Sequence, residues 1–541
     1  MERTHASAPP SSDANTSRTS ARRPPPPSVR TASQRLEQRP TLSREQNQQT
    51  ATGHQDQADQ ATPADFTAKQ VARGGAWTVI GFGVGTLMRV GSSIVLTRVI
   101  PDAPSVYGVM AIVFSVYGGI LLFTDIGVSL LLTQNKRGAE PSFRNTAWTA
   151  QVLRGVSIWL LAIALSPLFA AAYPDFPGVQ QLVIVTALAA VIGGFTSTSA
   201  HLFSRNMEVH RLAKLDLIAQ LGGTTVTITH ALLAPSPWAL VSGTLATAAT
   251  RLVTSHLMSD MRQRFQWDRV AASHLVTMGR WVFLSTALAF ACHQADRLLF
   301  AKMITVEQLG IYSIAVRLAH AAADVLRRLS GNVVYPILCR AHHSGGDLSA
   351  AFFEHRARVV AAASMALTFL CGGGAAVLDL LYEDEFAAGG WILQIFAVYA
   401  WIDCCLLTPR LQVVLAKGQP RWSAAANFTK VIAMIALIWI GYNQFGFPGA
   451  VAGYALAELP RYAVTLWGCC DVGVSRPGTD LKLMLWFAAV SAGTFFIDQT
   501  LAERGYNSLI RCFAAAILPT VVWGRAALQV FMTRKVDSAR N

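Results

Sequence analysis

From Gly74 to near its C-terminus, the chain alternates between long apolar stretches and short polar connections. Each stretch is about 18–25 residues long, which is enough for an α-helix to cross a bilayer of about 30 Å. The pattern therefore predicts an all-α polytopic membrane protein with about fourteen transmembrane helices. We place these helices at residues 75–97, 107–132, 147–171, 179–202, 215–234, 237–257, 279–300, 309–336, 358–381, 388–408, 424–443, 448–467, 481–498 and 508–530.

Residues 1–70 differ from the rest of the chain. They are rich in Ser, Thr, Gln, Pro and Arg, and Phe66 is their one aromatic residue. Such a segment cannot bury enough apolar surface to offset the entropy lost on ordering. We therefore expect residues 1–70 to form a disordered cytoplasmic tail.

Composition supports a membrane protein and excludes other classes. Hydrophobic residues make up 52% of the 541 positions and charged residues only 14%, whereas soluble domains carry about 25% charged residues. The net charge of +14 lies mainly in the connections between spans, which argues against nucleic-acid binding. The eight cysteines include two adjacent pairs, a spacing that zinc ligands do not use. We expect no disulfide, no metal site and no cofactor.

The distribution of Lys and Arg predicts the orientation in the membrane. One set of alternate connections, with the C-terminal tail, holds twenty-two of these residues, among them Arg356, Arg410 and Arg461. The other set holds three. Because basic connections are retained in the cytoplasm, we expect both termini on that side.

Two segments of the chain, six expected spans apart, are similar to each other. Leu96–Ala111 and Phe300–Ser313 each contain a helix end, a basic residue, a short turn and a glycine, Gly108 or Gly310, that opens the next helix. A separation of six spans gives both copies the same orientation, as in transporters built from parallel repeats. We therefore expect two related lobes.

The stretch 309–336 carries charges that lipid does not tolerate. Arg317, His320, Asp324 and Arg328 fall near one face at a repeat of 3.6 residues. A charge at the bilayer centre costs at least ~2.5–3.5 kcal/mol, so this face should contact protein or a water-filled cavity. We assign Arg317, His320 and Asp324 to substrate binding, and Asp324 also to ion coupling. A structural role for Asp324 is the alternative.

Arg89 lies near the middle of the first span, between Gly85 and Gly91. A guanidinium group is always charged and offers a planar set of donors that suits phosphate oxygens. One interpretation is an anion anchor in a central cavity. The other is an ion pair between helices.

Other charged or titratable residues lie in the second and seventh spans. Arg297 is a further candidate for substrate binding, and Asp296, His293 and Asp125 are candidates for ion coupling. Each has a structural alternative. Asp296 and Arg297 could form an ion pair near the membrane surface, His293 could bridge helices, and Asp125 could support a helix bend.

Several segments together resemble a known transporter family, the polysaccharide (O-antigen-type) flippases of the multidrug/oligosaccharidyl-lipid/polysaccharide exporter superfamily. Sequence motifs support the resemblance over residues 74–340. In the rest of the chain it depends mainly on the expected order of the transmembrane helices. The matching segments are Gly74–Trp77, Leu96–Ile100 with Tyr107-Gly108, Asp125–Gly127, Asn145–Trp148, Ser204–Ala213, Ala295–Phe300, Leu309–Tyr312 and Val334–Pro336. The chain departs from the family pattern at His293-Gln294 and Ala301-Lys302.

The resemblance implies two six-helix lobes around a central cavity and two further C-terminal helices. In this chain the lobes would be 71–260 and 273–470, followed by spans 13 and 14 at 481–532. It also implies a non-enzymatic flippase in the bacterial cytoplasmic (inner) membrane that exports a polyprenyl-diphosphate-linked oligosaccharide for surface polysaccharide biosynthesis. The implied partners are that lipid-linked oligosaccharide and membrane lipids, with a polysaccharide polymerase or export machinery as a further candidate.

Two alternative functions follow from the same pattern. An ion-coupled exporter of small solutes or drugs would use the same architecture, although cationic drugs favour acidic cavities. A membrane polysaccharide polymerase or ligase would need a large outer loop, whereas each expected outer connection has about ten residues or fewer.

Overall fold

The computed structural model describes residues 68–123, 132, 140–176, 178–205, 208–259, 262–269, 272–273, 288, 290–292, 294–343 and 346–538. Within these ranges the secondary structure is helical and contains no strand. The expected all-α class is confirmed. The expectation for the tail, residues 1–67 in particular, lies outside the described residues.

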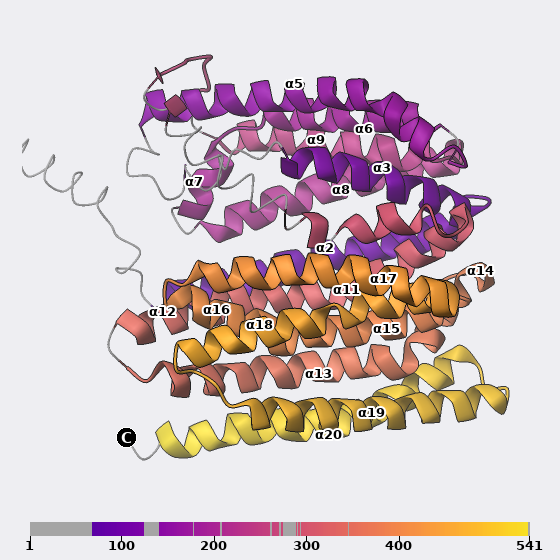
Figure 1. Ribbon diagram of the computed structural model, residues 1–541. Helices are drawn as coiled ribbons and strands as arrows, with labels where there is room; N and C mark the ends of the chain where they lie inside the picture. Colours follow the sequence, from indigo (N-terminus) through magenta and orange to yellow (C-terminus); the bar gives the residue numbers. More distant parts are fainter. Residues whose placement is uncertain are drawn as a thin grey trace, which may run out of the picture. The chain divides into compact units, whose positions relative to one another are not determined.

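The helices that precede residue 260 pack mainly on one another (Figure 1). Helix α8 lies along α2 and α9, while α6 packs against α5, α9 and α3. Their bounds are α2 (Ala68–Val99), α3 (Ala103–Phe123), α5 (Pro141–Ala172), α6 (Val179–Gly194), α7 (Ser199–Arg205), α8 (Val209–Leu233) and α9 (Trp238–Leu257).

The helices that follow residue 294 form a second set of neighbours. Helix α13 packs against α15, α19 and α20, and α11 contacts both α15 and the earlier helices α2 and α3. The bounds are α11 (Val306–Leu329), α12 (Tyr335–His343), α13 (Leu348–Leu381), α14 (Asp384–Ala387), α15 (Gly390–Trp401), α16 (Thr408–Ala416), α17 (Pro420–Leu456), α18 (Glu458–Asp471), α19 (Pro477–Glu503) and α20 (Ser508–Ser538).

Two π-helical segments and one sharp bend interrupt these helices. Ser330–Val334 joins α11 to α12, and Ile402–Leu407 joins α15 to α16. Inside α17, Gly446 has φ 63° and ψ −149°, a conformation that only glycine adopts easily, so α17 is two helices across a bend.

Nine segments within the described ranges are long and apolar enough to cross a membrane. One of them, Pro420–Asp471, contains two of the spans that the sequence predicts. The expected 279–300 span lies largely outside the described residues. A polytopic membrane protein is therefore confirmed, and the count of fourteen spans stays a prediction.

The two similar segments of the sequence touch each other where α3 crosses α11. A Cβ atom at Gly108 would overlap the carbonyl oxygen of Val306, and one at Gly310 would overlap that of Pro104. In each contact a glycine meets the residue four positions before the other glycine, so the two contacts are equivalent under the offset of 202 residues between the two segments. The related segments thus meet face to face, and only glycine permits this backbone approach.

We predict that Gly108→Ala destabilises the protein by about 1–3 kcal/mol, because the added methyl group must force α3 away from α11. Gly118→Ala is a matched control on α3, since a Cβ there meets no atom within 4 Å. Thermal unfolding of the detergent-solubilised protein measures the difference. Equal stability of the two variants would contradict the close crossing.

Candidate functional site

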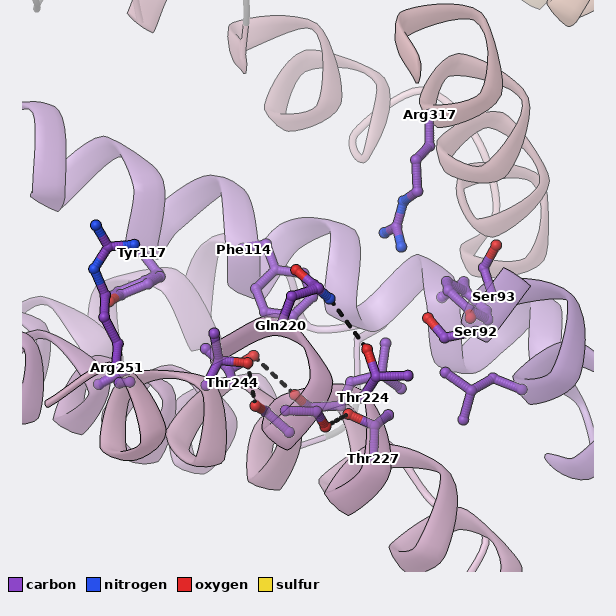
Figure 2. Close-up of a pocket in the computed structure, with 18 residues that line it drawn as sticks. Ser92, Ser93, Phe114, Tyr117, Gln220, Thr224, Thr227, Thr244, Arg251 and Arg317 are labelled. Atoms are coloured by element: carbon purple, nitrogen blue, oxygen red, sulfur yellow. Dashed lines mark hydrogen bonds between the residues drawn. The ribbon is translucent and has the colours of Figure 1, made fainter. Parts of the chain in front are cut away.

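A cavity of about 390 Å³ lies among α2, α3, α6, α8 and α9, and Arg317 of α11 reaches it from the other set of helices. Figure 2 shows Arg317 projecting toward Ser92 and Ser93, with Arg251 at the far end. Both helix sets therefore bound the cavity, and an arginine side chain lies at each of its ends.

The two terminal arginines of the cavity differ in their partners. The Arg251 guanidinium lies 2.5 Å from the Asp216 carboxylate, so its charge is balanced. Arg317 stands 5.6 Å over the Tyr107 ring and has no ion pair within the described part of the chain. An anion entering the cavity would therefore find its unbalanced positive charge at the Arg317 end.

Arg89 lies beside the same end of the cavity. Its Nη1 is 3.4 Å from Gln220 Oε1, its Nη2 donates to Thr86 at 2.9 Å, and no described carboxylate pairs with it. The Arg89 and Arg328 guanidinium groups lie 5.5 Å and 3.9 Å from the Phe82 ring.

The structure brings several of the predicted site residues into one electrostatic neighbourhood. The charges of Asp324, Arg328, Arg317 and Asp216 all act on Arg89. Each of the two carboxylates already pairs with another arginine, so the three cations leave this neighbourhood with excess positive charge, which suits a ligand with more than one negative charge.

Asp324 begins a chain of alternating charges that leads away from this neighbourhood. It pairs with Arg327, whose Nη1 also donates to the buried Asp403 at 2.8 Å. Asp403 lies in the π-helical segment Ile402–Leu407, and its other oxygen is 3.3 Å from Arg461. The side chain of Asp324 is 44% exposed and that of Asp403 is 4% exposed, so the chain of charges runs from an exposed position of α11 into the buried interior.

The inner end of this charge chain is fully buried. Arg461 lies 3.1 Å from Glu458, which pairs with Lys430 at 2.5 Å, and Lys430 also donates to the Tyr399 hydroxyl at 3.3 Å. Three carboxylates thus alternate with three cations across α11, Ile402–Leu407, α18 and α17. Each buried charge has a partner of opposite sign, as a low-dielectric interior requires.

A second buried cluster supports the π-helical segment from its other side. Arg356 donates from Nε to the Cys405 carbonyl at 3.1 Å, and Arg410 donates to the Leu406 carbonyl at 3.2 Å. Both guanidinium groups pair with Asp480 of α19. The backbone around Asp403 is therefore fixed by side chains from α13, α16 and α19.

These contacts correct three assignments made from the charge distribution. Arg356, Arg410 and Arg461 were expected in polar connections, but each is buried inside a helix and held by a carboxylate. They lie close to span ends, where a basic residue cannot be told from an orienting loop residue by sequence alone. The feature of the sequence that pointed to buried ion pairs was the presence of possible carboxylate partners, Asp403, Glu458 and Asp480.

Three further predicted residues, His320 on α11 and Asp296 and Arg297 before it, lie outside the cavity lining. His320 lies among aromatic rings, 6.0 Å from Phe396 and 5.8 Å from Tyr399. Asp296 is buried and accepts a 2.5 Å hydrogen bond from Tyr312, while Arg297 donates to Gln294 at 2.8 Å.

Two other candidates for ion coupling, Asp125 and His293, lie outside the described residues. Among the residues that are described, no group of three or more His, Cys, Asp or Glu side chains could hold a metal ion.

Several hydrogen bonds join the two helix sets near one end of the molecule. Ser93 and Tyr382 share a 2.8 Å hydrogen bond between hydroxyl groups, Ser105 donates to Glu307 at 3.3 Å, and Tyr173 donates to the Leu298 carbonyl at 3.1 Å. Burial raises the pKa of the Tyr382 hydroxyl, so it stays protonated and can maintain its bond.

Sequence reasoning missed the polar wall of the cavity on α8 and α9, formed by Gln220, Thr224, Thr227, Thr244 and Thr247. The available signal was a run of threonines at helical spacing on two successive spans, where leucine would be more common. Sequence reasoning also missed Lys430, whose charge within an apolar stretch was a usable sign.

Comparisons with known proteins agree with this architecture. Residues 95–389 match the family described as "Polysaccharide biosynthesis protein". The lipopolysaccharide biosynthesis protein WzxC of Escherichia coli is 19% identical, over 71% of this chain and 76% of the relative. The teichuronic acid biosynthesis protein TuaB of Bacillus subtilis is 19% identical, over 74% of this chain and 82% of the relative.

Solved structures share the fold at low sequence identity. A lipid II flippase MurJ in an inward closed conformation has a TM-score of 0.64 at 11% identity, over 84% of this chain and 100% of that chain. An inward-facing multidrug resistance MATE family transporter of the MOP superfamily has a TM-score of 0.56 at 13% identity, over 72% of this chain and 94% of that chain. The family resemblance expected from the sequence is confirmed.

We predict that Glu458→Gln destabilises the protein by about 3–5 kcal/mol, because Lys430 would keep its charge in a buried site without its carboxylate. The double variant Glu458→Gln/Lys430→Met removes both charges and should recover much of this loss. Thermal unfolding in detergent measures both effects. A double variant no more stable than Glu458→Gln would contradict the pairing.

Proposed function

The chain belongs to the polysaccharide biosynthesis protein family, and from that premise we propose that it is a flippase for a polyprenyl-diphosphate-linked oligosaccharide. The family, the relatives and the fold make it a multi-pass transporter of the bacterial inner membrane rather than an enzyme. The proposed movement is from the cytoplasmic to the outer face, for the synthesis of a surface polysaccharide.

The observation that carries the proposal is a pair of arginines beside a polar cavity. Neither Arg89 nor Arg317 has an ion-pair partner within the described part of the chain. A sugar diphosphate cannot cross hydrocarbon unaided, because its charges would lose their hydration. Guanidinium groups offer several donors that match phosphate oxygens. The cavity can therefore hold the headgroup while the polyprenyl tail stays in the bilayer.

We propose that the two helix sets are the lobes expected at 71–260 and 273–470, and that they move against each other. Alternating access would require the contacts Ser93–Tyr382 and Ser105–Glu307 to open. The basic connections support an orientation with both termini in the cytoplasm, which makes this contact layer the outer gate. A polysaccharide polymerase or export machinery is a further proposed partner for the released product.

We propose Asp324 as the residue that couples transport to an ion gradient. Asp324 acts on the charge of Arg89 and pairs with Arg327, the first cation of the buried charge chain. A change in the charge of Asp324 would therefore alter the electrostatic balance at both arginines. Asp296, His293 and Asp125 are the other proposed coupling residues, and Arg297 and His320 remain proposed contributors to substrate binding.

The headgroup proposal is preferred over export of cationic drugs for an electrostatic reason. Arg89, Arg317 and Arg328 repel a cation, and Asp324 already pairs with Arg327. A cationic drug would enter this neighbourhood against a net positive charge.

We predict that the wild-type protein restores surface glycan to a bacterial strain that lacks its own polysaccharide flippase. Arg89→Ala and Arg317→Ala should lose this activity, because each removes an anchor for the diphosphate. Arg504→Ala, in the exposed turn between α19 and α20, is the matched control and should complement fully. Full activity of both cavity variants, expressed at wild-type level, would contradict the site.

We predict that Asp324→Asn loses most of the stimulation of transport by an imposed proton or sodium gradient, yet retains exchange without a gradient. The amide keeps the shape but cannot change charge. Asp471→Asn is the control, since Asp471 pairs with Arg421 in an exposed position. Transport in proteoliposomes with and without each gradient measures both variants. An unchanged gradient response in Asp324→Asn would exclude it as the coupling residue.

A further inference from the structure

We infer that the segment 262–269, which follows α9 at the basic end of the first helix set, binds anionic phospholipid headgroups at the membrane surface. This inference goes beyond the transport step, because it concerns how the first helix set is anchored in the bilayer. In the orientation proposed above, the bound surface is that of the cytoplasmic leaflet. The segment reads Arg262-Gln-Arg-Phe-Gln-Trp-Asp-Arg269.

The side chains that this segment leaves exposed are of two kinds, aromatic and cationic. Phe265 is 66% exposed and Trp267 is 55% exposed. The exposed cations are Arg262, Arg264 and Arg269. None of these three arginines has an ion pair within the described part of the chain. Three arginines and one carboxylate, Asp268, give the segment a net charge of +2.

Backbone hydrogen bonds to α5 hold the segment in place beneath these side chains. The Gln266 N–H donates to Thr149 Oγ1 at 3.1 Å. The Asp268 N–H donates to Thr146 Oγ1 at 3.0 Å, about one turn earlier on α5. The segment is therefore attached to the first helix set at two successive points of one helix.

Two side chains of the segment add further contacts with the first helix set. Gln263 donates to the Ser197 hydroxyl at 3.1 Å, shortly after the end of α6. The Phe265 ring lies 4.7 Å from the ring of Trp148, which is buried at the start of α5. Because these contacts use only part of the segment, it presents its arginines and most of its aromatic surface outward from a fixed base.

The segment begins where the apolar exposed side of α9 ends. Val253 and Leu257, near the C-terminus of α9, are 57% and 81% exposed. Since α9 occupies the expected span 237–257, these side chains face acyl chains. Arg262 follows Leu257 by only five residues. Tryptophan rings concentrate at the headgroup level of a bilayer, and arginines there attract anionic lipids, so the segment lies at the depth that its composition suits.

The size and chemistry of this surface favour a lipid layer over a protein partner. A stable protein interface uses about 20–30 residues on each side, whereas the segment has eight residues. A headgroup layer offers phosphates to the guanidinium groups and, directly beside them, an apolar boundary for the two rings. Headgroup binding at this segment therefore anchors the first helix set through α5, α6 and α9.

The test measures contact between Trp267 and lipids in nanodiscs that hold the full-length protein. Phosphatidylcholine nanodiscs receive an equal small share of either brominated phosphatidylglycerol or brominated phosphatidylcholine, with the bromines on the upper acyl chain, where they quench nearby tryptophans. Subtracting the signal of Trp267→Phe from that of the wild type isolates Trp267. We expect the phosphatidylglycerol to quench Trp267 at least about threefold more than the phosphatidylcholine.

Four variants separate the arginines from other causes. Arg262→Gln/Arg264→Gln/Arg269→Gln should abolish the preference for phosphatidylglycerol, and Arg264→Gln alone should lose part of it, which gives a second readout should the triple variant fold poorly. Arg504→Gln, in the exposed turn between α19 and α20, should keep the preference. Trp439, 65% exposed in an apolar stretch of α17 and isolated by Trp439→Phe, should be quenched equally by both lipids.

Three results would overturn the inference. Absence of quenching of Trp267 by both lipids, with quenching by aqueous iodide in its place, would put the segment off the membrane and available to a protein partner. Equal quenching by both lipids would show a ring at the interface without headgroup recognition. A preference that survives in the triple variant would exclude the arginines. None of these results depends on the transported substrate, so the flippase proposal is tested separately.

Discussion

A charge inside a membrane must be paired or hydrated, and α11 meets this requirement differently on its different sides. Toward the second helix set, Arg327 pairs with Asp324 and Asp403, and the alternation of charges continues to the buried Lys430–Glu458 pair. Toward the first set, Arg317 has no described carboxylate partner and faces a cavity. The balanced side holds the helices together, and the unbalanced side creates a place for an anionic headgroup.

The internal repeat gives these charges their frame. Gly108 and Gly310 allow α3 and α11 to cross at backbone contact, with each glycine facing the residue four positions before its equivalent in the other copy. This crossing lies close to the Ser105–Glu307 bond that joins the two helix sets. Because Tyr107 is next to Gly108 and Arg317 follows Gly310 by about two turns of α11, the crossing also positions the arginine over the Tyr107 ring. A contact of this kind can act as a pivot for two lobes.

The helical class, the repeat and the importance of α11 were all readable from the sequence, since periodicity and charge within apolar stretches are local signals. The partners of those charges were not. Arg410 and Arg461 resembled orienting loop residues, because their carboxylates lie on helices distant in sequence. His320 shared a helical stripe with Arg317, yet residues three apart differ by about 60° around a helix, enough to place one beside aromatic rings and the other at a cavity.

Direct measurement of translocation tests the central claim, that an arginine-lined cavity carries a lipid-linked sugar across the membrane. Purified protein in liposomes would be given polyprenyl-diphosphate sugars with a fluorophore on the sugar, and membrane-impermeant dithionite would report the share exposed outside. The account predicts that wild-type protein makes nearly all of the lipid accessible, while Arg89→Ala/Arg317→Ala leaves the inner-leaflet share protected. Wild-type protein no faster than protein-free liposomes, for several sugars, would contradict it.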